Sequence, residues 1–344
     1  MNRKTIWIII AVAISGFFVW LALRGLELDE VWANIISANF YWLIPSIAVY
    51  FVAVWVRTWR WDYMLRPLKH IPVRRLFPVV VIGYMGNNVY PFRAGEVLRS
   101  FVLYKREDIP MSASLATVVV ERVFDGLVML IFVFVALPLS PIPGDNVSVR
   151  NLVFIASIAF FIAMILFFIL ASMPKRFHAL GEWGLGLTGR LLTANSKAQI
   201  LGMLDNFLSG LESLRSFRNV MMIFFTSIII WLLETVKYWF VMHAFNFEVS
   251  FFALMLMNGV VNLATTLPSA PGYVGTFDTP GIEVLQLYGI PKEIAAAYTL
   301  VLHAALWFPI TVLGAYYMVR EGLSWADIGT AVEMKDEAEL NEKI

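Results

Sequence analysis

Long apolar runs recur along this chain and are separated by short polar or charged stretches. Each run has 17 residues or more, and the runs cover 5–23, 40–56, 112–137, 152–173, 220–245 and 294–319. A helix needs about 20 mainly apolar residues to cross the hydrocarbon core of a bilayer. The pattern therefore predicts an all-α polytopic membrane protein with about six crossing helices.

Two further apolar segments are interrupted by Gly, Pro and polar residues. They cover 76–104 and 251–287. We interpret each as a re-entrant or broken helical hairpin, because non-helical backbone at membrane depth must be buried in protein or line a wet cavity. Two alternatives remain: each segment is a pair of short crossings, or Gly and Pro only kink two helices.

The order crossing, broken hairpin, crossing occurs twice, over 40–137 and over 220–319. The two copies enter their hairpins from opposite sides, which predicts an inverted repeat. Paired interrupted segments of this kind indicate a transporter binding site. We expect a single transmembrane domain over 1–325 and an acidic cytoplasmic tail over 326–344.

The distribution of basic residues predicts the orientation. One acid, Asp62, opposes six basic residues after the run 40–56: Arg57, Arg60, Arg66, Lys69, Arg74 and Arg75. Cytoplasmic loops carry such an excess, so both termini are expected in the cytoplasm and the protein in the cell membrane. An interfacial aromatic belt is expected at the same boundary, formed by Trp55, Trp59, Trp61 and Tyr63. The stretch Pro138–Gly144 is expected to be an external turn.

A cytoplasmic loop contains one more amphipathic segment. Its apolar side chains fall on one helical face: Ile200, Leu204, Phe207, Leu208, Leu211 and Leu214. Such a helix either lies on the inner leaflet or packs under the bundle.

Composition narrows the function classes. Apolar residues make up 60% of the chain and charged residues 15%, which excludes a soluble enzyme. A net charge of +1 gives no global attraction to nucleic acid. The chain has no Cys, and its four His lack ligand spacing, so we expect neither a metal nor another cofactor. Nucleotide-binding and nucleophile motifs are absent from the sequence, and we expect a protein that is not an enzyme.

Ionisable residues inside spans cost at least about 2.5–3.5 kcal/mol each on insertion scales. Arg93, Glu96 and Arg99 would share one helical face with a net positive charge. Arginine suits phosphate because its planar fork bonds two oxygens. The cluster is interpreted either as a headgroup phosphate site or as a self-neutralising structural cluster.

The run 112–137 carries Glu121, Arg122 and Asp125. Arg122 and Asp125 are three residues apart and can pair, so Glu121 needs another partner, which we expect to be an arginine of the first hairpin. Glu234 and Lys237 have the same spacing and are expected to form a local ion pair.

The second hairpin offers further polar candidates. Its Asn262, Pro268 and Gly272 weakly echo Asn87, Pro91 and Gly95 of the first hairpin. Asn88 and Tyr273 lie near the two hairpin tips. Asp278 and Glu283 are either coupling-ion or proton sites or residues exposed to the external medium, and His303 is expected to be a hydrogen-bonded interior histidine.

Three motifs resemble those of a known family. Residues 88–99 (Asn-Val-Tyr-Pro-Phe-Arg-Ala-Gly-Glu-Val-Leu-Arg) resemble its Pro-x-Arg-x-Gly-Glu-x-x-Arg motif, and 121–125 (Glu-Arg-Val-Phe-Asp) its Glu-Arg-x-x-Asp motif. Residues 267–275 (Leu-Pro-Ser-Ala-Pro-Gly-Tyr-Val-Gly) are similar to Leu-Pro-x-Pro-Gly-Gly-x-Gly, with Tyr273 in place of the second Gly. The family is the flippase-like lysylphosphatidylglycerol synthase transmembrane region, which includes the membrane half of the multiple peptide resistance factor.

The resemblance implies an integral membrane protein that handles lipid headgroups, with a flippase role for aminoacylated phosphatidylglycerol in the best-understood relatives. The synthase chemistry of those relatives belongs to a separate soluble domain, which we expect to be absent here.

We therefore predict a transporter or flippase that binds a phospholipid or lipid-linked headgroup. The expected binding residues are Asn88, Arg93, Glu96, Arg99, Glu121, Arg122, Asp125, Asn262, Pro268, Gly272 and Tyr273. One alternative is a lipid-modifying enzyme with Glu121 or Glu96 as base. Another is a non-catalytic membrane partner of a separately encoded synthase or glycosyltransferase.

Overall fold

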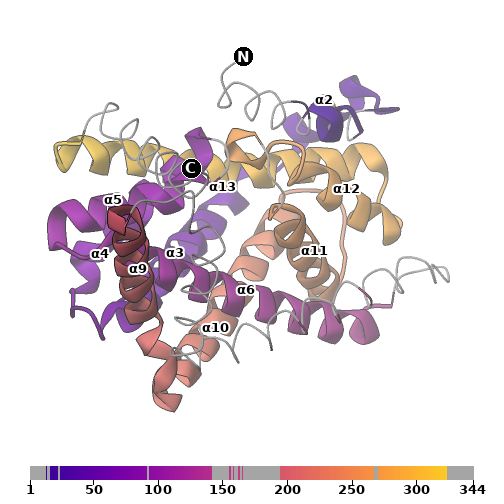
Figure 1. Cartoon of the computed structure of the whole chain (residues 1–344). Helices are drawn as coiled ribbons and strands as arrows, with labels where there is room; N and C mark the ends of the chain where they lie inside the picture. The colour runs from indigo at the N-terminus through magenta and orange to yellow at the C-terminus, as the bar shows by residue number, and fades with distance from the viewer. Residues whose placement is uncertain are drawn as a thin grey trace.

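A computed structural model describes residues 24–90, 93–141, 194–266 and 270–323, with scattered positions of 13–21 and 155–165. All regular structure in these residues is helical, which confirms the predicted all-α class (Figure 1). The helices are α2 (Leu28–Ser37), η1 (Phe40–Trp42), α3 (Leu43–Leu65), α4 (Val73–Val89), α5 (Ala94–Glu107), α6 (Met111–Leu139), α9 (Ala194–Gly210), η2 (Leu211–Arg215), α10 (Phe217–Met242), α11 (Phe251–Ala264), η3 (Pro271–Tyr273), α12 (Asp278–Leu287) and α13 (Lys292–Arg320).

Some sequence predictions fall outside the described residues. These are most of the runs 5–23 and 152–173, residue Pro268 and the tail 326–344.

Three described helical segments have the length and hydropathy of membrane crossings, namely Phe40–Leu65, Phe217–Met242 and Lys292–Arg320. Helix α6 is as long as α13, at 29 residues, and carries three charged side chains in its N-terminal half. At 1.5 Å per residue such a helix is about 43 Å long, more than the roughly 30 Å of a hydrocarbon core. The chain is therefore a helical membrane protein, and the count of six crossings stays a prediction.

Helices from the two halves of the chain pack against each other in pairs (Figure 1). Helix α3 packs against α10. Helix α4 of the first half packs against α13 of the second, and α11 of the second half packs against α6 of the first. Charged side chains on α3, α6 and α10 are thereby brought together although they are far apart in the sequence.

The first interrupted segment is a pair of helices, α4 and α5, in close contact. A Cβ atom added to Gly95 would lie 1.8 Å from the carbonyl oxygen of Gly83 and 2.5 Å from the backbone nitrogen of Asn87. Only glycine permits this approach. Beside the break, Arg93 adopts a left-handed conformation with φ of 53° and directs the chain into α5.

The second interrupted segment is also a pair of helices with an irregular break. Helix α11 ends at Ala264, the short turn η3 follows, and α12 begins at Asp278. In η3, Gly272 has φ of 70°, and an added Cβ would lie 2.7 Å from the indole nitrogen of Trp307 on α13. Both broken hairpins thus exist as helix, break and helix, and their re-entrant insertion stays a prediction.

The predicted amphipathic segment forms α9 and η2. Helix α9 packs against α6, and Leu211 is buried in the core beside Phe207 and Leu208. An added Cβ at Gly210 would lie 2.2 Å from the carbonyl oxygen of Ala113 on α6. Packing of this segment against the other helices is therefore confirmed, and its position relative to the inner leaflet stays a prediction.

The predicted end of the second run at Val56 is wrong. Helix α3 continues to Leu65, because residues 57–65 contain neither Gly nor Pro. Arg57 is 6% exposed and Arg60 is fully buried, so neither lies in a loop. Trp61 is also fully buried and does not belong to an interfacial belt.

The predicted start of the external turn at Pro138 is also wrong. Helix α6 continues through Pro138 and ends at Leu139.

Candidate functional site

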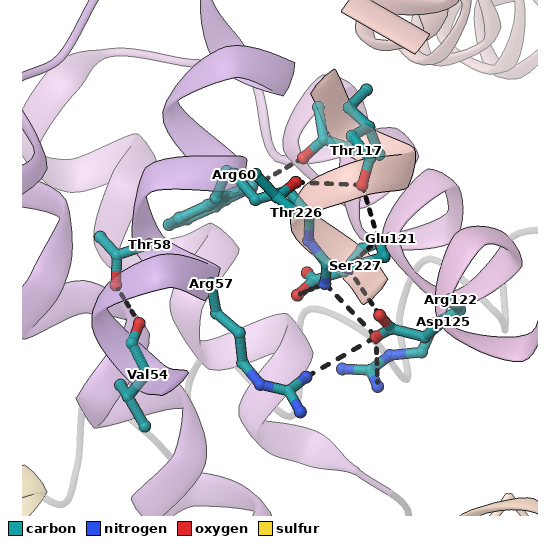
Figure 2. A network of polar contacts seen from close by, with 12 residues as sticks. Val54, Arg57, Thr58, Arg60, Thr117, Glu121, Arg122, Asp125, Thr226 and Ser227 are labelled. Atoms are coloured by element: carbon teal, nitrogen blue, oxygen red, sulfur yellow. Dashed lines mark hydrogen bonds and ion pairs between the residues drawn. The ribbon is translucent and has the colours of Figure 1, made fainter. Parts of the chain in front are cut away.

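Arg57 and Arg60 of α3 form the centre of a buried charged network. They lie three residues apart and therefore on the same side of the helix. Arg60 contacts Asp125 at 2.6 Å and Glu121 at 2.8 Å, both on α6. The hydroxyl of Ser227 on α10 accepts a further bond of 2.6 Å from Arg60 (Figure 2). Each carboxylate is thus held by a guanidinium from another helix.

Glu121 has a second partner in Arg99 of α5, which forms a short ion pair with its other oxygen. The expected pairing of Glu121 with an arginine of the first hairpin is confirmed. The Arg99 guanidinium also lies 4.8 Å from the centre of the Trp61 ring. Both members of the pair are buried, and together they fix α5 against α6 and α3.

Arg122 and Glu96 extend the network toward the break of the first hairpin. Glu96 lies 3.0 Å from Arg122 and 3.5 Å from Arg93. Arg122 is also 3.7 Å from Asp125, which agrees with the expected pairing of these two residues. Figure 2 shows Arg57 and Arg122 approaching Asp125 from two sides.

Glu234 and Lys237 of α10 form the expected local ion pair. The pair is not isolated, because Arg57 donates to Glu234 at 3.1 Å and lies 3.7 Å from Asp125. Lys237 is 2% exposed, and its ammonium lies 4.7 Å from the centre of the Tyr50 ring. The pair therefore belongs to the network, which connects ten charged residues in the described part of the chain: Arg57, Arg60, Arg93, Glu96, Arg99, Glu121, Arg122, Asp125, Glu234 and Lys237.

A cavity of about 140 Å³ opens beside this network. Among the described residues, its charged lining consists of four cations, Arg57, Arg93, Arg122 and Lys237, and one carboxylate, Glu234. The other lining residues are Tyr50, Tyr84, Asn87, Asn88, Trp231, Asn262, Thr265, Gly272, Tyr273, Phe277, His303, Leu306 and Trp307. The wall thus combines arginine forks, phenols, amides and rings, which suits a phosphate-bearing ligand.

The two hairpin breaks meet at this cavity. Arg93 of the first break donates to the carbonyl oxygen of Thr265 at the end of α11, at 3.0 Å. Its guanidinium lies 5.7 Å from the centre of the Tyr273 ring in the second break. The predicted residues Asn88, Asn262 and Gly272 also line the cavity.

Asn88 and Asn262 are largely engaged in structural bonds. The side-chain amide of Asn88 donates to Thr311 at 2.8 Å, and the backbone carbonyl oxygen of Asn88 accepts from the indole of Trp307 at 3.3 Å. Asn262 donates to the side-chain oxygen of Asn258 at 2.8 Å. Asn88 thereby fastens the cavity wall to α13, whereas the bond of Asn262 lies within α11.

His303 of α13 is a hydrogen-bonded interior histidine, as expected. Its Nδ1 lies 2.8 Å from Asp278, and its Nε2 lies 2.7 Å from the carbonyl oxygen of Gly272. Asp278 is 5% exposed and also accepts from the backbone nitrogen of Gly275, whereas Glu283 is exposed. Exposure is therefore wrong for Asp278, whereas Glu283 is exposed and its contact with the external medium stays a prediction.

Of the predicted binding residues, the structure connects Arg93, Glu96, Arg99, Glu121, Arg122 and Asp125 in the network. Arg99, Glu121 and Asp125 lie behind the cavity wall rather than in it. The sequence interpretation missed Arg57 and Arg60, and with them Tyr50 and Tyr84. The available signal was the helix-compatible stretch Val56–Leu65, in which the two arginines share a face. In the described part of the chain, no group of three His, Asp or Glu side chains is placed to hold a metal ion.

The fold and site define a helical integral membrane protein with a charged cavity between two broken helix pairs. The chain belongs to the family described as the lysylphosphatidylglycerol synthase TM region, whose family model matches residues 8–314.

Individual relatives are archaeal. A UPF0104 membrane protein of Methanocaldococcus jannaschii is 22% identical over 90% of this chain and 94% of its own. A UPF0104 membrane protein of Methanothermobacter thermautotrophicus is 24% identical over 81% of this chain and 85% of its own. Glycosyltransferase AglD of Haloferax volcanii is 26% identical over 79% of this chain, but the match covers 47% of that relative.

Proposed function

We propose that this protein binds the phosphate of a phospholipid or lipid-linked headgroup in the cavity and moves that lipid across the cytoplasmic membrane. The observation that carries the proposal is the charge of the cavity lining, where four cations face one carboxylate. Arginine binds phosphate in two-oxygen contacts, and a site shielded from bulk water strengthens each contact. The acyl chains would remain in the bilayer while the headgroup crosses the polar cavity.

The residues take two roles in this proposal. Arg57, Arg93, Arg122 and Lys237 line the cavity and would contact the phosphate. Arg99 was expected beside the phosphate, but it pairs with Glu121 behind the wall, so we assign it a positioning role. Glu121 and Asp125 would hold the arginines in place.

The movement would use the two halves of the chain as an inverted repeat. Its support is the shared order of elements, with α3, α4, α5 and α6 followed later by α10, α11, α12 and α13. The contacts of α4 with α13 and of α11 with α6 are equivalent under that correspondence. In such transporters the site lies between the repeats, where rocking of one repeat exposes it to alternate sides.

The test is headgroup movement in proteoliposomes, followed with labelled lipids and an impermeant reductant. We expect movement with the unaltered protein and at least about a tenfold loss with Arg122→Gln, which removes a cavity cation. Arg75→Gln is the matched control, because the Arg75 side chain is 72% exposed and lies outside the cavity. Absence of movement across a panel of anionic lipids, with and without an ion gradient, would contradict the proposal.

The name of the Haloferax relative favours a second candidate. That protein is called a glycosyltransferase, and this chain matches 47% of it. The region would then serve lipid modification, either as an enzyme or as a non-catalytic membrane partner. An enzyme predicts a new lipid species formed by the purified protein, whereas a partner predicts co-purification with a modifying enzyme.

A further inference from the structure

The charged network carries more positive than negative residues. Its ten members comprise six cations and four carboxylates, an excess of two positive charges. Removing a charge from water without a partner costs several kcal/mol. Behind the cavity wall, the positive charges of Arg60 and Arg99 equal the negative charges of Glu121 and Asp125. The excess of two positive charges therefore lies among the members at the cavity. An occupant with negative charge would neutralise it.

The neighbouring pair of Asp278 and His303 does not cancel this excess. Asp278 is not part of the cavity lining, and no ion pair joins it to the network among the described residues. It is the first residue of α12, where the helix dipole stabilises a carboxylate. Its oxygens also face the backbone nitrogen of Gly275 and the imidazole of His303, both at 2.8 Å. Its charge is therefore compensated locally.

Hydrogen-bond donors in the wall also lack acceptors. Tyr50, Tyr84 and Tyr273 line the cavity and can offer their hydroxyls to an occupant. The Nε atoms of Arg57 and Arg93 are buried and have no hydrogen-bond partner among the described residues. Leaving a buried donor unpaired costs about 1–3 kcal/mol. An occupant with several acceptor oxygens would provide hydrogen-bond partners for these donors.

We propose that the ligand of this cavity is a phosphomonoester or diphosphate lipid headgroup with at least two negative charges. This inference rests on the proposed function and narrows it. A phosphomonoester carries about −1.5 to −2 at pH 7 and three strong acceptor oxygens. It matches the excess of two charges. A phosphodiester headgroup carries one charge, and a zwitterionic headgroup carries none overall.

The experiment compares phosphatidic acid with phosphatidylglycerol of identical acyl chains, binding to the purified full-length protein in nanodiscs of zwitterionic lipid. Phosphatidic acid should bind at least about tenfold more tightly, because its second charge meets the uncompensated cations. Inorganic phosphate should compete only at much higher concentration. Equal binding of free phosphate and phosphatidic acid would overturn the assignment to a lipid headgroup.

Three variants distinguish the effect of the network's net charge on lipid preference from an effect on folding. Lys237→Gln lowers the excess to one and should reduce the preference for phosphatidic acid. The double variant Glu234→Gln with Lys237→Gln removes one charge of each sign, keeps the excess at two and should restore the preference. Arg93→Gln, at a partly buried position, gives a second single-charge test if Lys237→Gln does not fold. Equal affinity for the two lipids would overturn this inference and leave the proposed function intact, whereas no binding of either lipid would contradict both.

Discussion

Arg57 of α3 donates to Glu234 of α10 at 3.1 Å, across 177 positions of sequence. The other terminal nitrogen of Arg57 lies 3.7 Å from Asp125 of α6. Its guanidinium also lies 4.7 Å from the centre of the Trp231 ring. One side chain thus joins three long helices at the edge of the cavity, so the position of each helix is coupled to the ligand site.

Removing the fully buried Arg60 should strongly destabilise the protein. Arg60→Met removes one positively charged partner from each of the buried carboxylates Glu121 and Asp125. Breaking a buried ion pair costs about 3–5 kcal/mol. Thermal unfolding in detergent measures the loss. The exposed control Arg75→Gln should change stability by less than about 0.5 kcal/mol. Equal melting temperatures for the two variants would contradict a structural role for Arg60.

Arg99 and Glu121 should be energetically coupled. Arg99→Gln leaves the buried Glu121 with Arg60 as its remaining partner, and Glu121→Gln leaves the buried Arg99 without its carboxylate, whereas the double change removes both charges. The double variant should therefore lose less stability than the two single variants combined, by about 1–3 kcal/mol. A double-mutant cycle of unfolding in detergent gives this value, and an additive result would show that the pair is not coupled.

Gly95→Ala should push apart the two helices of the first hairpin, α4 and α5. The added methyl would overlap the carbonyl oxygen of Gly83, at 1.8 Å, so α4 and α5 must move apart. We expect a loss of at least about 2 kcal/mol and faster proteolysis at the break. Gly202→Ala on α9 is the control, because its Cβ would meet nothing within 4 Å. Unchanged stability of Gly95→Ala would contradict this close packing.

Gly272→Ala should impair lipid movement more than backbone strain alone explains. Gly272 has φ of 70°, and an added Cβ would press on Trp307, whose indole bonds to Asn88. Gly289 has φ of 80° with nothing within 4 Å of the added Cβ, so Gly289→Ala carries the strain without the contact. Proteoliposome assays of both variants should show a larger loss for Gly272→Ala. Similar losses would remove any role for the Trp307 contact.

The predicted orientation can be tested directly because the chain contains no cysteine. We expect the N-terminus in the cytoplasm and the first crossing to lead outward. Asp29→Cys should therefore react with an impermeant maleimide in intact cells, whereas Arg74→Cys should react only after the cells are opened. Both native residues are exposed. Labelling of both positions from outside would overturn the orientation.

Much of the fold was readable from local patterns. The predicted boundaries 112–137 and 294–319 lie within two residues of α6 and α13 at each end, and both interrupted segments are helix pairs. Spacing of three residues correctly paired Arg122 with Asp125 and Glu234 with Lys237. These features are local, so periodicity and spacing alone determine them.

The long-range part of the site was not readable in the same way. Arg57 and Arg60 follow an apolar run and resemble a basic cytoplasmic loop, because water or a buried carboxylate can satisfy an arginine equally well. The choice depends on Glu121, Asp125 and Glu234, whose position beside α3 follows from packing between distant helices. Sequence spacing contains no information about that contact.

The burial of two arginines in α3 also constrains how the protein is made. Their carboxylate partners lie 61, 65 and 177 residues later in the chain, so α3 leaves the ribosome before any of them. An arginine at the centre of an isolated helix costs about 2.5–3.5 kcal/mol during insertion. Arg57 and Arg60 lie in the C-terminal half of α3 and carry part of this cost, so we expect the stable insertion of α3 to depend on the later arrival of α6 and then α10. We therefore expect biogenesis of this protein to depend on cellular insertion machinery that keeps α3 out of contact with lipid until the second half of the chain has been synthesised.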